Sequence, residues 1–180
     1  SKLNTLSFAD DTTVYTSGNN VHEIAGYVNA ELNKIYDWLC SNRLKLNSSK
    51  TKFTVFSPNG IQHNFENTPI CIDGKQLTQF GTRYTEQTIN FLGINLDPHL
   101  TWKNHIECLR KKISKGLYVM NKLKNFLPPG ALKTLYFSLV ESYLSYGLMA
   151  WGNSTHINKL INLQKRAVRI IDRKSHKYHS

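Results

Sequence analysis

Phe8-Ala9-Asp10-Asp11 places two adjacent carboxylates directly after a short apolar segment that includes Leu3 and Leu6. Thr12-Thr13-Val14-Tyr15 follows, and its β-branched and aromatic residues favour a second strand. The pattern predicts a β-hairpin with the acidic pair at its tip. Carboxylate oxygens there are suitable ligands for Mg²⁺. Asp-Asp is also common in ordinary turns, and on these four residues alone the ordinary turn is the more frequent explanation.

Composition predicts one large or two small domains and an anionic partner. The 180 residues contain 23 Lys and Arg against 12 Asp and Glu, which gives a net charge of +11. Nucleic acid is the commonest partner of so basic a chain, and a generic basic globular protein is the alternative. The three cysteines, Cys40, Cys71 and Cys108, are widely spaced and form no Cys-x-x-Cys motif, so they indicate neither a disulfide scaffold nor a zinc site.

Targeting signals are absent from the sequence. It shows no secretory leader and no apolar run near the ~18 residues of a membrane helix. The cysteine usage fits a reducing compartment, so we expect an intracellular protein without a membrane partner. The chain lacks an initial Met and opens almost directly into a strand, as a piece of a longer protein would.

Residues 21–41 form the first expected helix. Asn20 is a suitable N-cap, with Glu23 three residues later, and Trp38 widens the apolar face. Residues on that face recur at steps of three and four: Val21, Ile24, Val28, Leu32, Ile35 and Leu39. The helix is expected to end near residues 41–42.

Short strands are expected between this helix and residue 97. Residues 53–56 favour a strand, and Asp73-Gly74 is a strong hairpin signal. Residues 79–86 show no period and read as a local insertion. Residues 89–96 predict another strand or a bent hairpin, in which Gly93 permits close backbone approach.

The second half predicts three helices. The first starts near Trp102 and continues to Leu127, where residues 128–130 (Pro-Pro-Gly) stop it. The second covers about 131–146, and the third is capped by Ser154 or Thr155. On the third helix, six residues are expected to face the core of the domain: Ile157, Leu160, Ile161, Gln164, Val168 and Ile171. The sequence therefore predicts an α+β chain with domains at 1–98 and 99–180.

Basic residues form two stripes on these helices. On the first helix Lys111, Lys115 and Lys122 share a face with Tyr118. The stripe on the third helix comprises Lys159, Arg166, Arg169 and Arg173. Such stripes favour a surface that follows a nucleic-acid backbone, and solvated helix faces are the alternative. Acidic residues at i±4 would support the alternative, and Glu107 is the only acid on the first helix.

Several motifs occur in the order found in reverse transcriptases of non-LTR retrotransposons (LINE elements of the Jockey-like group). Residues 8–11 resemble motif C, residues 38–52 resemble motif D, and residues 91–97 resemble motif E, the primer grip. Residues 145–152 and 163–169 resemble the thumb of these enzymes. The resemblance covers nearly the whole chain. It implies part of a right-hand polymerase palm, built of antiparallel strands and a helix, followed by an all-α three-helix thumb.

The resemblance also implies roles for individual residues in two-metal nucleotidyl transfer. Asp10 would bind Mg²⁺, with Asp11 as a second ligand or close support. Lys50 would protonate the leaving pyrophosphate, although an exposed loop lysine is an equal alternative. Phe91, Leu92 and Gly93 would contact the primer 3′ end, or serve as core strand and turn. The implied partners are an RNA template, a DNA primer and dNTPs, in the cytoplasm and nucleus.

In the resembling enzymes a further aspartate, on motif A, and the fingers precede the segment matched here. Since only seven residues precede Phe8, we expect this chain alone to be inactive as a polymerase, with an incomplete two-metal site. Other domains of the same polyprotein would lie upstream. A non-catalytic nucleic-acid-binding remnant and a decayed mobile-element product are the alternative functions.

Overall fold

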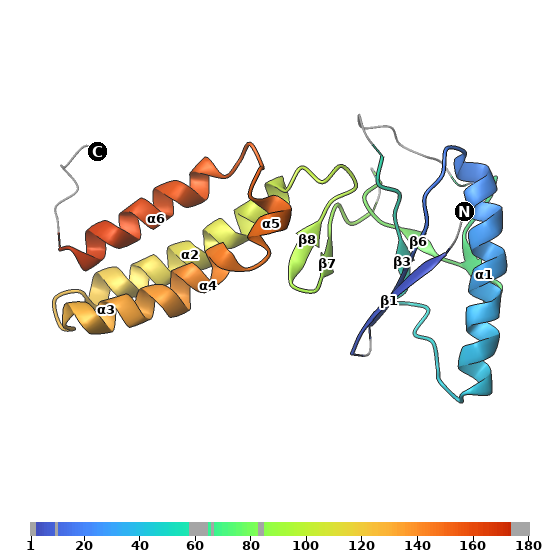
Figure 1. Cartoon of the computed structure of the whole chain (residues 1–180), viewed down its shortest axis with the longest axis horizontal. Helices are drawn as coiled ribbons and strands as arrows, with labels where there is room; N and C mark the ends of the chain where they lie inside the picture. Colours follow the sequence, from blue (N-terminus) through green and yellow to red (C-terminus); the bar gives the residue numbers. More distant parts are fainter. Residues whose placement is uncertain (1–2, 10, 58–64, 66, 83–84, 174–180) are drawn as a thin grey trace. The chain divides into compact units, whose positions relative to one another are not determined.

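The computed structural model describes residues 3–9, 11–57, 65, 67–82 and 85–173. It divides into two compact units, residues 1–87 and residues 88–180 (Figure 1). The first unit combines one long helix with short strands, and the second is mainly helical. The α+β class is therefore confirmed, while the palm and thumb assignment stays a prediction. The units divide before the domain boundary expected at 98/99, so residues 88–98 belong to the helical unit.

The acidic motif lies at the end of a β-hairpin, as predicted. Strands β1 (Asn4–Phe8) and β2 (Asp11–Tyr15) pair antiparallel, and Phe8 stands opposite Asp11. Ala9, in the connection, has a positive φ of 53°. Asp10 lies outside the described residues. The positive φ of Ala9 suits a tight connection between strands that twist in the right-handed sense.

Helix α1 (Val21–Ser41) begins with the predicted cap. The backbone N–H of His22 donates to Asn20 Oδ1 at 3.0 Å, and Asn20 Nδ2 donates to Glu23 Oε1 at 2.9 Å. Ala25 and Leu32 are the buried residues of the helix, whereas Trp38 is 59% exposed. Trp38 therefore extends the apolar face beyond the core.

Four two-residue strands complete the first unit. β4 (Cys71–Ile72) and β5 (Lys75–Gln76) form the hairpin predicted from Asp73-Gly74. β3 (Lys52–Phe53) pairs with β6 (Thr78–Gln79) in parallel, so the prediction of antiparallel strands is wrong for this pair. The 24-residue connection between them is long enough for the crossover that parallel strands need. The core of this unit comprises Ala25, Leu32, Phe65, Ile70, Ile72 and Leu77.

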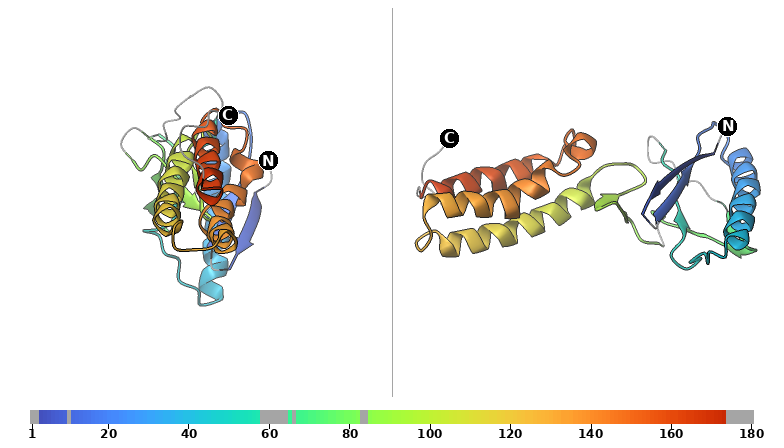
Figure 2. Two further views of the ribbon diagram at one scale, coloured as in Figure 1. Left: turned by 90° about the vertical axis from the view of Figure 1, so that its left-hand side faces the viewer. Right: turned by 60° about the horizontal axis from the view of Figure 1, so that its bottom comes forward.

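Three helical segments pack side by side in the second unit, as Figure 2 shows. The helices are α2 (Lys103–Leu123), α3 (Pro129–Tyr136), the π-helical segment η2 (Phe137–Glu141), α4 (Ser142–Ser145), α5 (Leu148–Trp151) and α6 (Asn158–Ile171). Their buried side chains form one core: Ile106, Leu109, Ile113, Leu117, Met120, Val140, Trp151, Leu160, Ala167 and Ile170. Because α3, η2 and α4 are continuous, the three predicted helices are confirmed in outline.

The boundaries of the helices on either side of the α2–α3 connection differ from the prediction. α2 ends at Leu123, and Leu127 lies in a turn whose amide donates to Leu123 O at 3.0 Å. Pro129 begins α3 instead of stopping α2, because its fixed φ and missing N–H suit the first helical position. The prediction that α2 continues to Leu127 is therefore wrong.

Two faces also differ from the periodic prediction. In the second helix the pattern predicts a core face with Leu132, Leu135, Leu139 and Tyr143, whereas Val140 is fully buried, since η2 inserts a wider turn there. On α6, Ile161 and Val168 are 39% and 48% exposed, so their predicted inward placement is wrong. Ala167 and Ile170 are buried instead, together with Leu160. The face of α6 that packs on the core is therefore rotated relative to the predicted face.

A buried carboxylate joins the last hairpin to α2. Strands β7 (Ile89–Phe91) and β8 (Ile94–Leu96) pair antiparallel, which confirms the bent hairpin. After β8, Asp97 is only 7% exposed and accepts bonds from the amides of His99, Thr101 and Trp102 at 3.0–3.1 Å. Thr101 Oγ1 donates to Asp97 Oδ2 as well, at 3.1 Å. These bonds stabilise a connection in which Trp102 has a φ of 63°.

His105 is a second buried polar group at this connection. The amide of Asn95 donates to His105 Nδ1 at 3.2 Å, so Nδ1 carries no proton. The ring lies near Trp102 and Trp151, with centroid distances of 6.4 and 5.7 Å. Its Nε2 is buried without a hydrogen-bond partner among the described residues. Burial, and secondarily the charge of Lys112, lowers the pKa of His105 below its usual range.

We expect the second unit to lose stability as the pH falls below about 6.5, the ordinary pKa of histidine. The unfolded chain then binds the proton first, because the pKa of His105 is lowered only in the folded state. Hydrogen exchange of the α2 core amides at pH 7.5 and 5.5 measures the change. His105→Gln should flatten the pH dependence, and His156→Gln should leave it intact. Equal pH dependence in His105→Gln and the unmodified chain would contradict this explanation.

Candidate nucleic-acid interface and catalytic hairpin

The β1–β2 hairpin presents Asp11 at its end, where a metal ligand is expected. Asp11 and Phe8 are both exposed, Phe8 to 65%. An exposed carboxylate fits one position in the coordination shell of Mg²⁺. The described residues contain no group of three His, Cys, Asp or Glu that could hold a metal ion. A magnesium site at this hairpin therefore needs ligands in addition to Asp11.

Lys50 lies in a turn directly before β3. Its amide donates to Asn47 O at 3.1 Å, and Thr51 donates to the same oxygen through both its amide and its hydroxyl. Asn47 thus fixes the turn, while the Lys50 side chain is exposed. This exposure is compatible with the predicted role as a proton donor and equally with an ordinary loop lysine.

The three predicted primer-grip residues lie at the turn of the β7–β8 hairpin. Phe91 ends β7, and Leu92 and Gly93 form the turn with φ angles of 47° and 82°. Asn90 stabilises the turn from within, because Asn90 Oδ1 accepts the Gly93 amide at 3.1 Å. Leu92 is 37% exposed and Gly93 is also exposed, so this turn lies at the surface.

The α2 stripe, Lys111, Lys115, Tyr118 and Lys122, is confirmed as an exposed surface. All four side chains are exposed, opposite the buried face that contains Ile113. Lys122 Nζ lies 5.7 Å from the centroid of the Tyr118 ring. A lysine beside an exposed tyrosine combines a phosphate-binding charge with a surface for a sugar or base.

The α6 stripe faces α2 along one flank. Lys159, Arg166 and Arg173 are exposed and recur at intervals of seven residues, whereas Arg169 is partly buried. Glu107 joins the two helices: it accepts a bidentate bond from Arg110, at 2.6–2.9 Å, and lies 3.8 Å from Lys159 Nζ.

Two of these contacts modify the predicted surface. The bond from Arg110 lowers the pKa of Glu107, so this acid stays ionised and is already paired. The charges of Lys159 and of Lys111 in the α2 stripe contribute less to this lowered pKa. Arg173 Nη2 donates to Leu127 O at 3.0 Å, so one of its donors already supports the α2–α3 connection.

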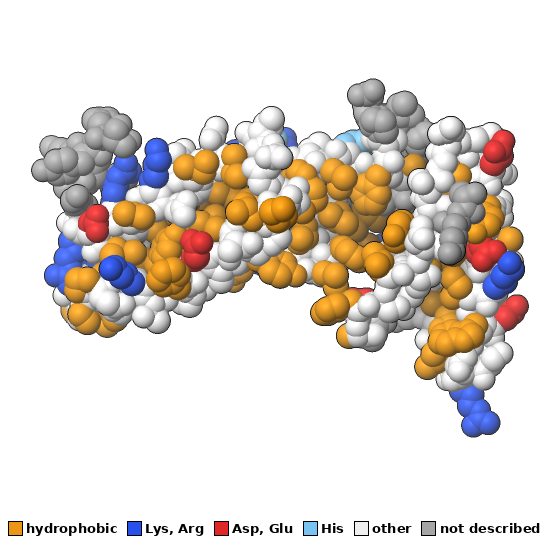
Figure 3. Space-filling view, in the orientation of Figure 1, with side chains coloured by type: hydrophobic (Ala, Val, Ile, Leu, Met, Phe, Trp, Pro, Cys, Tyr) orange, Lys and Arg blue, Asp and Glu red, His pale blue; other side chains and the backbone are white. Residues whose placement is uncertain are grey.

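The positive charge of the chain belongs to one unit. Residues 1–87 contain eight basic and eight acidic side chains, whereas residues 88–180 contain fifteen and four. The whole net charge of +11 is therefore carried by the helical unit. Figure 3 shows Lys and Arg side chains gathered at the end of this unit that bears the α2–α3 connection. Within the described residues, no helix has the length and apolarity required to cross a membrane.

Comparison with known proteins identifies the family. A sequence model described as "Reverse transcriptase (RNA-dependent DNA polymerase)" matches residues 1–96, more than half of the chain. The chain belongs to the reverse transcriptase family. The matched segment includes both the acidic hairpin and the β7–β8 turn.

Curated relatives place this reverse transcriptase among those of mobile elements. It is 26% identical over 171 residues to the RNA-directed DNA polymerase from mobile element jockey of Drosophila melanogaster. Probable polymerases from transposon BS and transposon X-element of the same species are 26% and 23% identical. Each alignment covers 92% of this chain but 18% of the relative. The resemblance to reverse transcriptases of non-LTR retrotransposons is thus confirmed. No solved structure matches the chain significantly.

The sequence alone does not indicate the two side chains, Asp97 and Tyr146, whose hydrogen bonds hold the β7–β8 hairpin and the segment after it. Asp97 was assigned to the end of motif E, and its four hydrogen bonds were not predicted. The amide donors follow it within five residues, so the Asp97-Pro98 turn was the available signal. Tyr146 and Leu92 are 54 residues apart and interact directly, and no local pattern indicates that contact.

Proposed function

We propose that this chain is the C-terminal palm and thumb region of an RNA-directed DNA polymerase of a non-LTR retrotransposon. The intact enzyme adds dNTPs to a primer 3′ end on an RNA template, in the cytoplasm and nucleus. The observation that carries this proposal is the family match over residues 1–96, which contain the acidic hairpin. Similarity to the jockey polymerase extends over 92% of the chain and supports the same function for the helical unit.

In this proposal the first unit and the last hairpin serve the chemistry. Asp10 and Asp11 are carboxylate ligands of Mg²⁺, which stabilises charge on the reacting phosphate when bound. Lys50 donates a proton to the leaving pyrophosphate. The Phe91–Gly93 turn contacts the primer 3′ end through its exposed backbone. Asp11, Lys50, Leu92 and Gly93 are exposed, which supports access to a substrate.

The helical unit binds the template–primer duplex through α2 and α6. Its net charge, the exposed α2 stripe and the pairing of Glu107 within the bundle support this role. Phosphate neutralisation by lysine and arginine releases counterions, so affinity should fall steeply with salt. Because backbone phosphates carry no sequence information, this surface should bind duplexes of different sequence similarly.

Replacing Lys111, Lys115 and Lys122 together with Gln is expected to weaken binding to an RNA–DNA duplex. At moderate salt the loss should be on the order of tenfold. The slope of log affinity against log salt should become less steep by about one per phosphate contact removed. Fluorescence anisotropy with a labelled duplex, over a series of KCl concentrations, measures both quantities.

A matched control replaces three exposed lysines of the first unit, Lys34, Lys45 and Lys75, with Gln. It removes the same net charge from surfaces outside the helical unit. If the control lowers the salt slope as much as the α2 variant does, binding follows total charge, and α2 is not the contact surface.

A further inference from the structure

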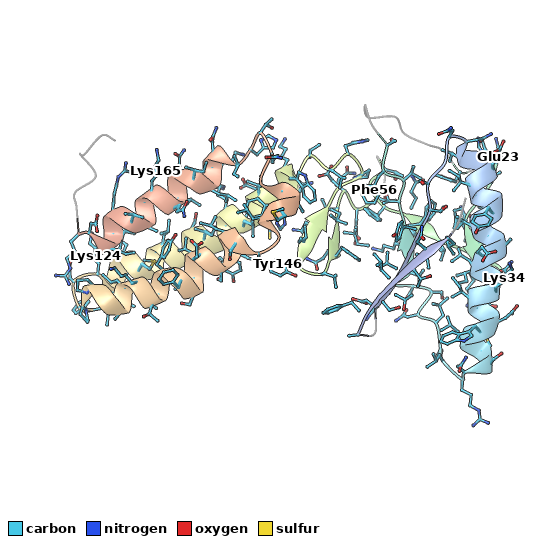
Figure 4. All side chains as sticks on the ribbon, in the orientation of Figure 1. Glu23, Lys34, Phe56, Lys124, Tyr146 and Lys165 are labelled. Carbon is cyan, nitrogen blue, oxygen red and sulfur yellow. The ribbon has the colours of Figure 1, made fainter. Side chains whose placement is uncertain are left out.

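Tyr146, which follows α4, contacts the turn of the β7–β8 hairpin. Its hydroxyl donates to the carbonyl oxygen of Leu92 at 2.5 Å. The ring lies against Gly93, where an added Cβ would stand 3.3 Å from Tyr146 Cε1. Figure 4 labels Tyr146 in the helical unit beside this hairpin. The Tyr146 side chain thus forms a hydrogen bond with Leu92 and packs against Gly93.

The helical core holds Tyr146 from the opposite side. Trp151, which is 1% exposed, donates from Nε1 to the backbone oxygen of Tyr146 at 3.0 Å. Gly147 has a φ of 65°, and a Cβ there would lie 2.6 Å from Ile94 Cδ1. The positive φ favours glycine at this position, and the Gly147 backbone lies against the Ile94 side chain of β8. Through these contacts the position of Tyr146 is set by the core.

The hairpin itself has little independent support. Its two strands contain three residues each, and a two-stranded hairpin alone is marginally stable in water. Leu92 adopts a positive φ, which is unfavourable for a residue with a branched side chain. Asn90 bonds the turn locally, and the Asn95 amide of β8 donates to His105 of α2, but neither bond holds the Leu92–Gly93 turn on the helices. The Tyr146 hydroxyl supplies the long-range bond to the turn itself.

We propose that Tyr146 is a positioning residue that fixes the Leu92–Gly93 turn on the helical bundle. The backbone that contacts the primer 3′ end and the helices that bind the duplex then move as one body. This inference rests on the proposed function, since it assigns the turn to the primer end. It adds a residue outside the matched segment 1–96, with a hydrogen bond as its physical basis.

Tyr146→Phe in the 180-residue chain tests the proposal, because it removes the hydroxyl and keeps the ring on Gly93. Hydrogen exchange of the amides of residues 91–95 should accelerate about three- to tenfold, as expected for one lost hydrogen bond. Affinity is measured for an RNA–DNA duplex with a recessed primer 3′ end and for a blunt duplex of equal length. The preference for the recessed end should fall by a similar factor, with the affinity for the blunt duplex unchanged.

Tyr143→Phe is the matched control, since the Tyr143 ring faces Lys112 in the same unit. It should change neither quantity. Unchanged exchange in Tyr146→Phe would overturn the proposal, as would faster exchange with an intact end preference. An unmodified chain that binds duplex without preferring the recessed end would refute the positioning role alone. An unmodified chain that binds no duplex would refute the proposed function as well.

Discussion

Trp151→Ala is expected to destabilise the helical unit by about 3–5 kcal/mol, the range for removing a large buried aromatic side chain. Trp151 is 1% exposed and lies in the core with residues of α2 and α6. Its ring also lies 5.7 Å from that of His105, and its Nε1 donates to Tyr146 O. The substitution therefore removes packing, an aromatic contact and a hydrogen bond together. Much of a small unit's stability would be lost.

Hydrogen exchange of the amides of Ile113 and Leu117 reports this loss for the helical unit by itself. These residues are buried in the middle of α2 and should exchange only when the unit unfolds. Met149→Ala is the matched control, because Met149 belongs to the same short helix and is fully exposed. The control should change stability by less than about 0.5 kcal/mol. Similar small effects of both substitutions would show that Trp151 does not organise this core.

Local signals in the sequence predicted much of the fold. The cap at Asn20, the Asp73-Gly74 turn and the hairpin at residues 89–96 depend on neighbouring residues, and all three are confirmed. The π-helical segment was not predicted, because it depends on packing between helices. Leu139 of that segment lies against Gly116 of α2, where an added Cβ would be 3.0 Å away. Helical periodicity in one segment cannot show such a contact.

The candidate site likewise combines features that local sequence predicts with contacts between distant segments that it does not predict. Exposure of the α2 stripe followed from spacing on one helix, and the structure confirms it. The division of charge between the units could be counted from the sequence once the boundary was known. The ion pair between Lys159 and Glu107 and the hydrogen bond from Tyr146 to Leu92 join distant segments, so only the folded structure shows them.

Exposed apolar residues on the helical unit add a feature that composition did not indicate. Figure 3 shows hydrophobic side chains at its surface, and Phe137, Val168 and Met149 are among the exposed ones. Single exposed apolar residues are normal in folded proteins.

Asp97→Ala is expected to destabilise the connection between β8 and α2 by about 3 kcal/mol or more. The carboxylate accepts three backbone amides and one hydroxyl, all at 3.0–3.1 Å, and is 7% exposed. Alanine would leave these partly buried donors without an acceptor, and an unpaired donor costs about 1–3 kcal/mol where it is buried. Relaxation of the turn and entry of water should recover part of the sum. Trp102 would then lose the bond that holds its positive φ.

Asp97→Asn separates hydrogen bonding from packing. Asparagine keeps one acceptor oxygen and the volume of the side chain, but it turns an amide group toward donors that need an acceptor. We therefore expect Asp97→Asn to retain part of the stability that Asp97→Ala loses, as measured by urea unfolding and by exchange of the Thr101 and Trp102 amides. Because this connection carries the β7–β8 hairpin, both variants should also reduce the preference for a recessed primer end. Equal stability of Asp97→Ala and the unmodified chain would show that water replaces the carboxylate at no cost, and that the connection is held by the packing of Trp102 and Trp151 instead.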